Sequence, residues 1–135
     1  MKQSIRNQFD QIYYEADFDA EHNWVDVTWN GELTLSDIKI GVLAFAELLE
    51  ISRATKLLNN TVEVAGEFAD LRHWTNAESI KPLSELGLKC YAQVSGDRKN
   101  HQLDELTSSL LSQGLSYKAF KSAKKAKVWL SKFEG

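Results

Sequence analysis

The sequence has few of the residues on which several classes of protein depend. Its one cysteine, Cys90, excludes an internal disulfide framework and any zinc or iron–sulfur site built from several cysteines. One proline and seven glycines exclude a collagen-like or proline-rich chain. The longest apolar run, Ile40 to Ala46, is too short to cross a bilayer, and the first residues form no apolar signal-peptide core. We therefore expect a cytoplasmic protein without membrane insertion.

The residues that usually perform metal, nucleotide or nucleophile chemistry are also scarce. His22, His73 and His101 lie in separate segments, with no His-x-x-x-His or Cys-x-x-Cys pair, so we expect no metal site. Neither glycine-rich phosphate-binding motif occurs, which disfavours nucleotide cofactors, and we expect no cofactor. Cys90 lies in an apolar segment and is interpreted as a core residue. Because no nucleophile and base converge, we predict no catalytic residues and a non-enzymatic protein.

The rest of the composition is that of an ordinary globular protein with an uneven distribution of charge. With 135 residues, 43% of them hydrophobic, the chain fits a single domain over residues 1–135. The net charge of −3 combines an acidic segment, residues 1–50, with a lysine-rich one, residues 114–135. We interpret these segments as two solvated faces of one domain. The lysines are not interleaved with arginines or exposed aromatic residues, so we expect no nucleic-acid binding.

Hydrophobic periodicity predicts a hairpin followed by alternating helices and strands. The hairpin comprises Phe9–Phe18, with Phe9, Ile12 and Tyr14 pointing inward, and Trp24–Trp29. The later elements are a helix over Leu35–Leu49 capped by Thr34, a strand over Thr55–Leu58 ending at the turn formers Asn59 and Asn60, a helical region over Glu67–Leu86, a strand over Leu88–Val94, a helix over Leu103–Gln113, a strand over Leu115–Phe120, and a helix from Ser122 to Phe133. This ββαβαβαβα order predicts an α/β fold with a mixed sheet, parallel beyond its first strand and covered by helices.

The first predicted helix has an anomaly in its amphipathic pattern. Ile40 and Leu43 fall on its polar stripe, among serine, lysine and glutamate residues. Single exposed aliphatic residues are common and need no function. The functional interpretation is that Ile40 and Leu43 belong to a surface for a protein partner or for self-association.

A ligand site is predicted where the third strand ends. A helix that starts near Glu67 would place its N-terminus beside the segment 59–66, at the edge where open α/β sheets bind ligands. Arg72 and His73 lie on this helix and combine a cation with an imidazole, while Trp74 is expected to pack inward. The candidate ligand-binding residues are therefore Asn59, Asn60, Arg72 and His73, with structural packing as the alternative.

The element order and several motifs resemble the STAS-like domains, small bacterial domains related to anti-sigma-factor antagonists of the SpoIIAA type. The motifs are Trp29-Asn30-Gly31, Leu57-Leu58-Asn59-Asn60, Gly87-Leu88-Lys89, and a closing Phe120-x-Ser122-x-x-x-Ala126-x-x-Trp129-Leu130. The resemblance implies a mixed sheet of four to five strands with helices mainly on one side. It also implies a non-enzymatic signalling or protein-interaction module. The alternative is a domain of the same fold that binds a small apolar molecule or lipid, in a pocket near Phe68, Trp74 and Tyr91.

The resemblance further suggests a phosphorylation site. In SpoIIAA-type antagonists, a serine or threonine after the third strand is phosphorylated by a partner kinase and typically follows an aspartate in a D-x-[ST] context. The matching segment here is Asn59-Asn60-Thr61, which makes Thr61 the candidate acceptor. Asn59 stands at the aspartate position, and the alternative is a threonine with no regulatory role.

Overall fold

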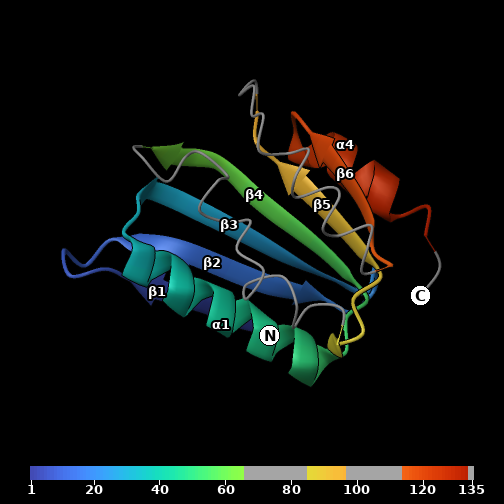
Figure 1. Cartoon of the computed structure of the whole chain (residues 1–135), viewed down its shortest axis with the longest axis horizontal. Coiled ribbons are helices and arrows are strands. Elements are labelled where there is room, and N and C mark those ends of the chain that lie inside the picture. Colours follow the sequence, from blue (N-terminus) through green and yellow to red (C-terminus); the bar gives the residue numbers. More distant parts are fainter. Residues whose placement is uncertain (66–84, 97–113, 134–135) are drawn as a thin grey trace.

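The computed structural model describes residues 1–65, 85–96 and 114–133 and is built on one mixed sheet (Figure 1). The six strands lie in the sheet in their order along the chain. They are β1 (Lys2–Arg6), β2 (Ile12–Asp19), β3 (Trp24–Glu32), β4 (Lys56–Ala65), β5 (Cys90–Val94) and β6 (Ser116–Phe120), and the helices described are α1 (Leu35–Ser52) and α4 (Ala123–Leu130). Strands β1, β2 and β3 pair antiparallel, whereas β3 to β6 pair in parallel. The predicted α/β class and mixed sheet are confirmed.

The sheet has six strands rather than the predicted four to five, because the N-terminal segment forms β1. This short edge strand is mostly polar, and only Gln3 and Ile5 are partly buried. Its sequence therefore looks like that of a loop. The prediction that Phe9 points inward is wrong, because Phe9 lies in the turn between β1 and β2. The Asn7 side chain accepts hydrogen bonds from the backbone N–H groups of Phe9 and Gln11, and Phe9 is 73% exposed.

Strand β4 contradicts the predicted turn at Asn59 and Asn60. It is ten residues long and continues through both asparagines to Ala65, paired in parallel with β3 and, over Lys56–Asn60, with β5. Asn59 lies opposite Val27 of β3 and Gln93 of β5. The turn preference of asparagine is local and weak compared with two ladders of backbone hydrogen bonds. The pairing between strands therefore overrides it.

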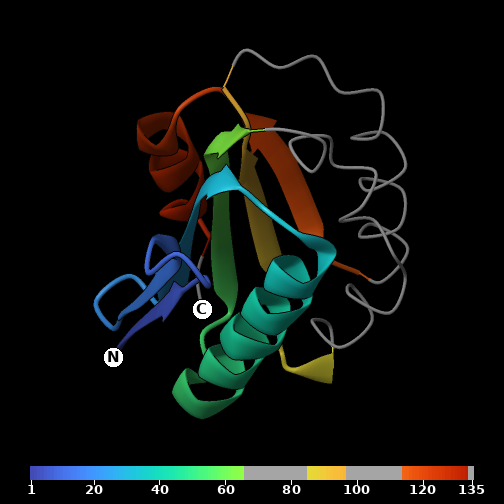
Figure 2. The same cartoon turned by 90° about the vertical axis from the view of Figure 1, so that its left-hand side faces the viewer.

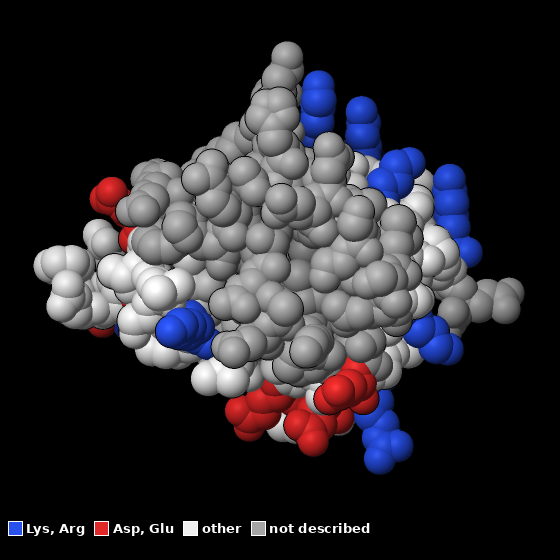
Figure 3. All heavy atoms as spheres, viewed as in Figure 1, with Lys and Arg blue, Asp and Glu red and all other residues white. Residues whose placement is uncertain are grey.

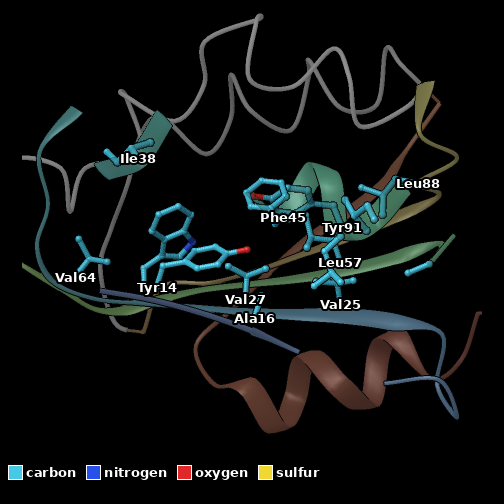
Figure 4. Close-up of a cluster of buried hydrophobic side chains, with 14 of the residues drawn as sticks. Tyr14, Ala16, Val25, Val27, Ile38, Phe45, Leu57, Val64, Leu88 and Tyr91 are labelled. Carbon is cyan, nitrogen blue, oxygen red and sulfur yellow. The ribbon is translucent and has the colours of Figure 1, made fainter. Parts of the chain in front are cut away.

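The two helices lie on opposite faces of the sheet (Figure 2). Phe45, Leu48 and Leu49 of α1 pack in one buried cluster with Leu57, whereas Leu58, its neighbour, packs with Ala126 and Leu130 of α4. Figure 4 shows Ile38 and Phe45 on the α1 side of the sheet, with α4 on the other side. Successive strand residues point to opposite faces, so β4 contributes Leu57 to one buried cluster and Leu58 to the other. The resemblance implied helices mainly on one side of the sheet, whereas the two described helices lie on opposite sides.

Helix α1 begins and ends at local signals in the sequence. The Thr34 side chain accepts a hydrogen bond from the Asp37 N–H, and the Asp37 carboxylate accepts one from the Thr34 N–H, which forms a capping box. At the other end, Arg53 adopts a left-handed conformation that closes the helix. The helix extends one turn beyond the predicted Leu49, and its first residue, Leu35, is exposed.

The C-terminal elements follow the prediction closely. Strands β5 and β6 lie within the predicted segments, and Ser122 caps α4, whose Ala126 and Leu130 are buried. Of the predicted helical region Glu67–Leu86, only residues 85 and 86 are described, and Leu103–Gln113 lies outside the described residues. Among the helices described, none combines the length and the apolar character needed to cross a membrane.

Candidate functional site

The outward-facing side of α1 carries a row of exposed aliphatic residues. Ile40 is 49% exposed, Leu43 is 71% exposed, and Ile51, three turns after Ile40, is 60% exposed. At about 100° per residue, these three side chains project within an arc of about 80°. We name Ile40, Leu43 and Ile51 the α1 outer face. The predicted exposure of Ile40 and Leu43 is confirmed, and Ile51, which the same periodicity could have identified, extends the row.

Acidic side chains border the α1 outer face. Glu47 and Glu50 are both exposed, and at about 100° per residue they lie in or next to the same arc. In Figure 3, acidic side chains gather along the edge of the molecule where Figure 1 shows α1. The α1 outer face is therefore apolar at Ile40 and Leu43, and Glu47 lies between Leu43 and Ile51, so its C-terminal half carries negative charge. Exposed Lys39, by contrast, lies at its N-terminal border.

The buried side of α1 packs closely on the sheet. Gly41 faces the Trp29 ring so closely that a Cβ atom there would overlap its Cη2 and Cζ3 atoms. Phe45, Leu48 and Leu49 are at most 4% exposed. The Gln3 side chain adds a hydrogen bond of 3.1 Å from Nε2 to the Ala44 carbonyl oxygen. Because α1 packs on the sheet over much of its length, the α1 outer face is held in a fixed position.

A buried row of polar side chains crosses the middle of the sheet, centred on Asn59. The Trp29 Nε1–H donates to Asn59 Oδ1 at 2.6 Å, and Asn59 Nδ2 donates to the Tyr91 hydroxyl at 2.9 Å and to Gln93 Oε1 at 3.2 Å. Asn59 is 1% exposed and Gln93 is 0% exposed. These groups satisfy one another across β3, β4 and β5, as buried polar groups must. Gln93, a single polar residue in an apolar strand, is the signal that could have revealed this row.

Thr61 closes the same row. Its hydroxyl accepts a hydrogen bond of 3.0 Å from Gln93 Nε2 and donates one of 3.2 Å to the Val94 carbonyl oxygen, and the residue is 1% exposed. A kinase would reach this hydroxyl only if the segment opened, and a phosphate there would bring about two negative charges into a buried position. Phosphorylation of Thr61 stays a prediction.

Of the four predicted ligand residues, the structure describes only Asn59 and Asn60. Asn59 is buried on the α1 side, whereas the next residue, Asn60, points to the opposite face of the strand. The Asn60 side chain accepts a hydrogen bond of 3.1 Å from the Val62 N–H. Arg72 and His73 lie outside the described residues. The two asparagines therefore point to opposite faces of β4, and the turn expected at this point is a strand; ligand binding by these residues stays a prediction.

A polar groove lies at the N-terminal end of α1. It has a volume of about 730 Å³, and its walls come from the β1–β2 turn, the end of β3 and the start of α1. Tyr13 lines the groove, is 3% exposed, and has a buried hydroxyl without a hydrogen-bond partner among the described residues. Burial and, to a smaller extent, the nearby Asp37 carboxylate raise the pKa of Tyr13, so the phenol stays protonated at neutral pH.

The turn between β2 and β3 contains the one group of potential metal ligands found among the described residues. Potential ligand atoms of Asp19, Glu21 and His22 lie within 4.8 Å of one another. Asp19 Oδ2 is 2.7 Å from His22 Nδ1, and this hydrogen bond lowers the pKa of Asp19. The His22 ring also stacks on Trp24 with 4.3 Å between ring centroids. The Asp19 carboxylate and the His22 imidazole already pair with each other. The structure of the turn is therefore enough to explain why these three side chains lie close together.

Cys90 is a core residue, as predicted. It is 3% exposed and packs in the cluster beneath α4, and burial raises the pKa of its thiol. A protonated thiol is a poor nucleophile and a poor metal ligand.

Comparisons of the chain with protein-family models, with curated proteins and with solved structures found no match.

Proposed function

We propose that this chain is a non-enzymatic protein-interaction module, resembling the anti-sigma-factor antagonists in function, and that it binds a partner protein through the α1 outer face. The observation that carries the proposal is the exposure of Ile40, Leu43 and Ile51 in one row of a well-packed helix. Rows of aliphatic residues at helical spacing are typical anchors for a partner groove. Their exposure to water costs free energy that a partner would recover by covering them.

The charges beside this row indicate the chemistry of the partner. Glu47 is exposed within this row and Glu50 beside it, so the surface that complements its C-terminal half has lysine or arginine next to apolar residues. The polar row around Asn59 supports binding rather than catalysis. Its amides and hydroxyls are buried and paired with one another, and burial raises the pKa of Tyr91 far above the neutral range.

The test places a photo-activated cross-linking amino acid at Leu43 and, as a control, at the equally exposed Phe9 in the β1–β2 turn. We expect Leu43 alone to cross-link a discrete partner in cells. The recombinant partner should then bind the double variant Ile40→Glu/Leu43→Glu at least about tenfold more weakly than wild type, and Phe9→Glu unchanged. A cross-link of equal yield from both positions, or full affinity in the double variant, would contradict the proposal.

A second candidate function is binding of a small molecule in the groove at the N-terminal end of α1, favoured by the Tyr13 hydroxyl, which has no hydrogen-bond partner among the described residues. Amide, hydroxyl and carboxylate groups line this groove beside Phe9, Ile12 and Tyr13, so its ligand would combine polar groups with an apolar part. Of the predicted apolar pocket near Phe68, Trp74 and Tyr91, only Tyr91 is described; it is buried in β5, and its hydroxyl accepts a hydrogen bond from Asn59. Amide chemical shifts recorded with a library of small polar compounds test this candidate. Saturable shifts at the groove should disappear in Tyr13→Phe and persist in Tyr117→Phe, which removes a second buried hydroxyl that has no partner in the described part of the chain.

A further inference from the structure

A basic surface lies on the opposite side of the sheet from α1. A shallow groove of about 420 Å³ between β6 and α4 is lined by four lysines and by Phe120, Val128 and Trp129. The four lysines, which we name the lysine surface, are Lys118, Lys124, Lys125 and Lys132. Figure 3 shows basic side chains gathered where Figure 1 places β6 and α4.

The positive charge of the lysine surface is not neutralised within the described structure. Residues 114–133 contain six lysines and no aspartate or glutamate. Lys127, outside the lysine surface, lies 3.5 Å from the Asp26 carboxylate, whereas none of the four lysines of the surface forms an ion pair with another described residue. A protein of net charge −3 thus gathers positive charge on one side. This arrangement favours a negatively charged partner.

The position of two of these lysines adds to the argument. Lys124 and Lys125 lie in the first turn of α4, next to its N-cap Ser122. The N-terminus of a helix carries partial positive charge, so lysines there are unfavourable in the unbound protein. A negatively charged partner would relieve this repulsion, because the lysines and the helix N-terminus would then all attract it.

The type of residue distinguishes among negatively charged partners. Residues 114–133 contain no arginine, the side chain best suited to geometric recognition of phosphates in nucleic acids or phosphopeptides. Lysines act as hydrated point charges and suit a diffuse layer of charge, such as anionic lipid headgroups. Val128 is 54% exposed and Trp129 is half-buried between Phe120 and Phe133. An aliphatic residue and a tryptophan among lysines are typical of a surface that touches a membrane interface.

We propose that the lysine surface docks the protein on the surface of a membrane rich in anionic lipids. The contact is peripheral: the lysines meet the headgroups while Val128 and the exposed part of Trp129 reach the boundary of the acyl chains. Since α1 lies across the sheet from α4, the α1 outer face points away from the membrane and stays accessible to a partner protein. The proposal does not depend on the partner-binding function.

The test is sedimentation with vesicles of phosphatidylcholine alone or with about one third phosphatidylserine, near physiological salt and at about 0.5 M salt. We expect wild type to bind the anionic vesicles only, and to be released at high salt. Lys124→Glu/Lys125→Glu should weaken binding about 30-fold or more. The control Lys2→Glu/Lys39→Glu changes the net charge equally at exposed sites on β1 and α1, and should bind like wild type.

Three results would overturn the proposal. One is the absence of wild-type binding to anionic vesicles, and another is an equal loss in the control, which would indicate a response to net charge alone. The third is binding to soluble polyglutamate or to DNA without binding to vesicles, which would assign the surface to an acidic polymer. Val128→Ser carries no charge change and should reduce vesicle binding severalfold while leaving the thermal midpoint nearly unchanged, since Val128 is exposed.

Discussion

Replacing Gly41 by alanine is expected to destabilise the protein, although alanine is the better helix former. In the interior of an exposed helix the exchange would stabilise by about 1 kcal/mol. Here the added Cβ would overlap the Trp29 ring and would lie 3.1 Å from Tyr14 Cδ2. Overpacking of this kind costs about 1–3 kcal/mol. The balance is a net loss of about 1 kcal/mol, provided that Trp29 cannot move aside.

The structure shows why Trp29 is fixed. It is 0% exposed, its Nε1–H donates to Asn59 at 2.6 Å, and its ring meets Tyr14 edge-on with 5.0 Å between centroids. Any rotation of the indole ring would break this buried hydrogen bond or lose the aromatic contact. The alternative is an outward shift of α1, which would open its contacts with the sheet. Both routes cost stability, so the predicted sign does not depend on which one the protein takes.

Urea unfolding of Gly41→Ala and of the control Ala44→Gly measures the effect. Ala44 is a half-buried position of the same helix that packs against the core, and glycine there should cost at least about 1 kcal/mol, from helix propensity and from the lost methyl group. The structure therefore predicts that glycine is preferred at position 41 and alanine at position 44. A loss of about 1 kcal/mol in a domain of this size lowers the thermal midpoint by about 4 °C. If Gly41→Ala is more stable than wild type, the close packing of α1 on Trp29 is wrong.

Three further substitutions, one of them with a matched control, test other buried or partly buried positions. Asn59→Ala should lower the free energy of unfolding in urea by about 2–4 kcal/mol, because Trp29 Nε1–H and the polar groups of Tyr91 and Gln93 lose a buried partner. The control Asn60→Ala, at a half-buried position on the other face, should lower it by less than about 1 kcal/mol. Burial raises the pKa of Asp26 more than Lys127 lowers it, so the folded state favours the protonated carboxyl, and its contribution to stability is lost as pH rises through that raised pKa. Asp26→Asn should therefore melt higher than wild type at neutral pH and match it near pH 3; a lower midpoint at neutral pH would show that the Lys127 ion pair dominates. Tyr117→Phe removes a buried hydroxyl that has no partner among the described residues, so its thermal midpoint should be unchanged or higher.

The elements that could be predicted from the sequence are those specified by local signals. The Thr34 cap and the periodic apolar residues identified α1, and Ser122 and the Ala126–Leu130 spacing identified α4. A helix fixes the relation between residues three or four positions apart, so its buried and exposed faces can be derived without knowing the rest of the fold. This is why the exposure of Ile40 and Leu43 could be predicted before any tertiary contact was known.

The elements that could not be predicted depend on partners distant in the chain. Strand β1 is polar and forms because β2 offers a free edge for pairing. Asparagine is common in turns. Asn59 nevertheless lies in a strand, because Trp29, Tyr91 and Gln93, each at least 30 positions away, form hydrogen bonds with its side chain. Periodicity contains no information about such pairings, since a buried asparagine is acceptable only where cross-strand partners are present.

The single sheet also determines how the two proposed surfaces relate. The α1 outer face and the lysine surface lie on opposite sides of it, separated by two distinct buried clusters. Substitutions at sites that share no contacts usually have additive effects. Glutamates at Ile40 and Leu43 should therefore leave vesicle binding intact, and glutamates at Lys124 and Lys125 should leave partner binding intact. If either pair of substitutions abolished both activities, the common cause would be disruption of the sheet, and neither surface could be assigned from its own variant.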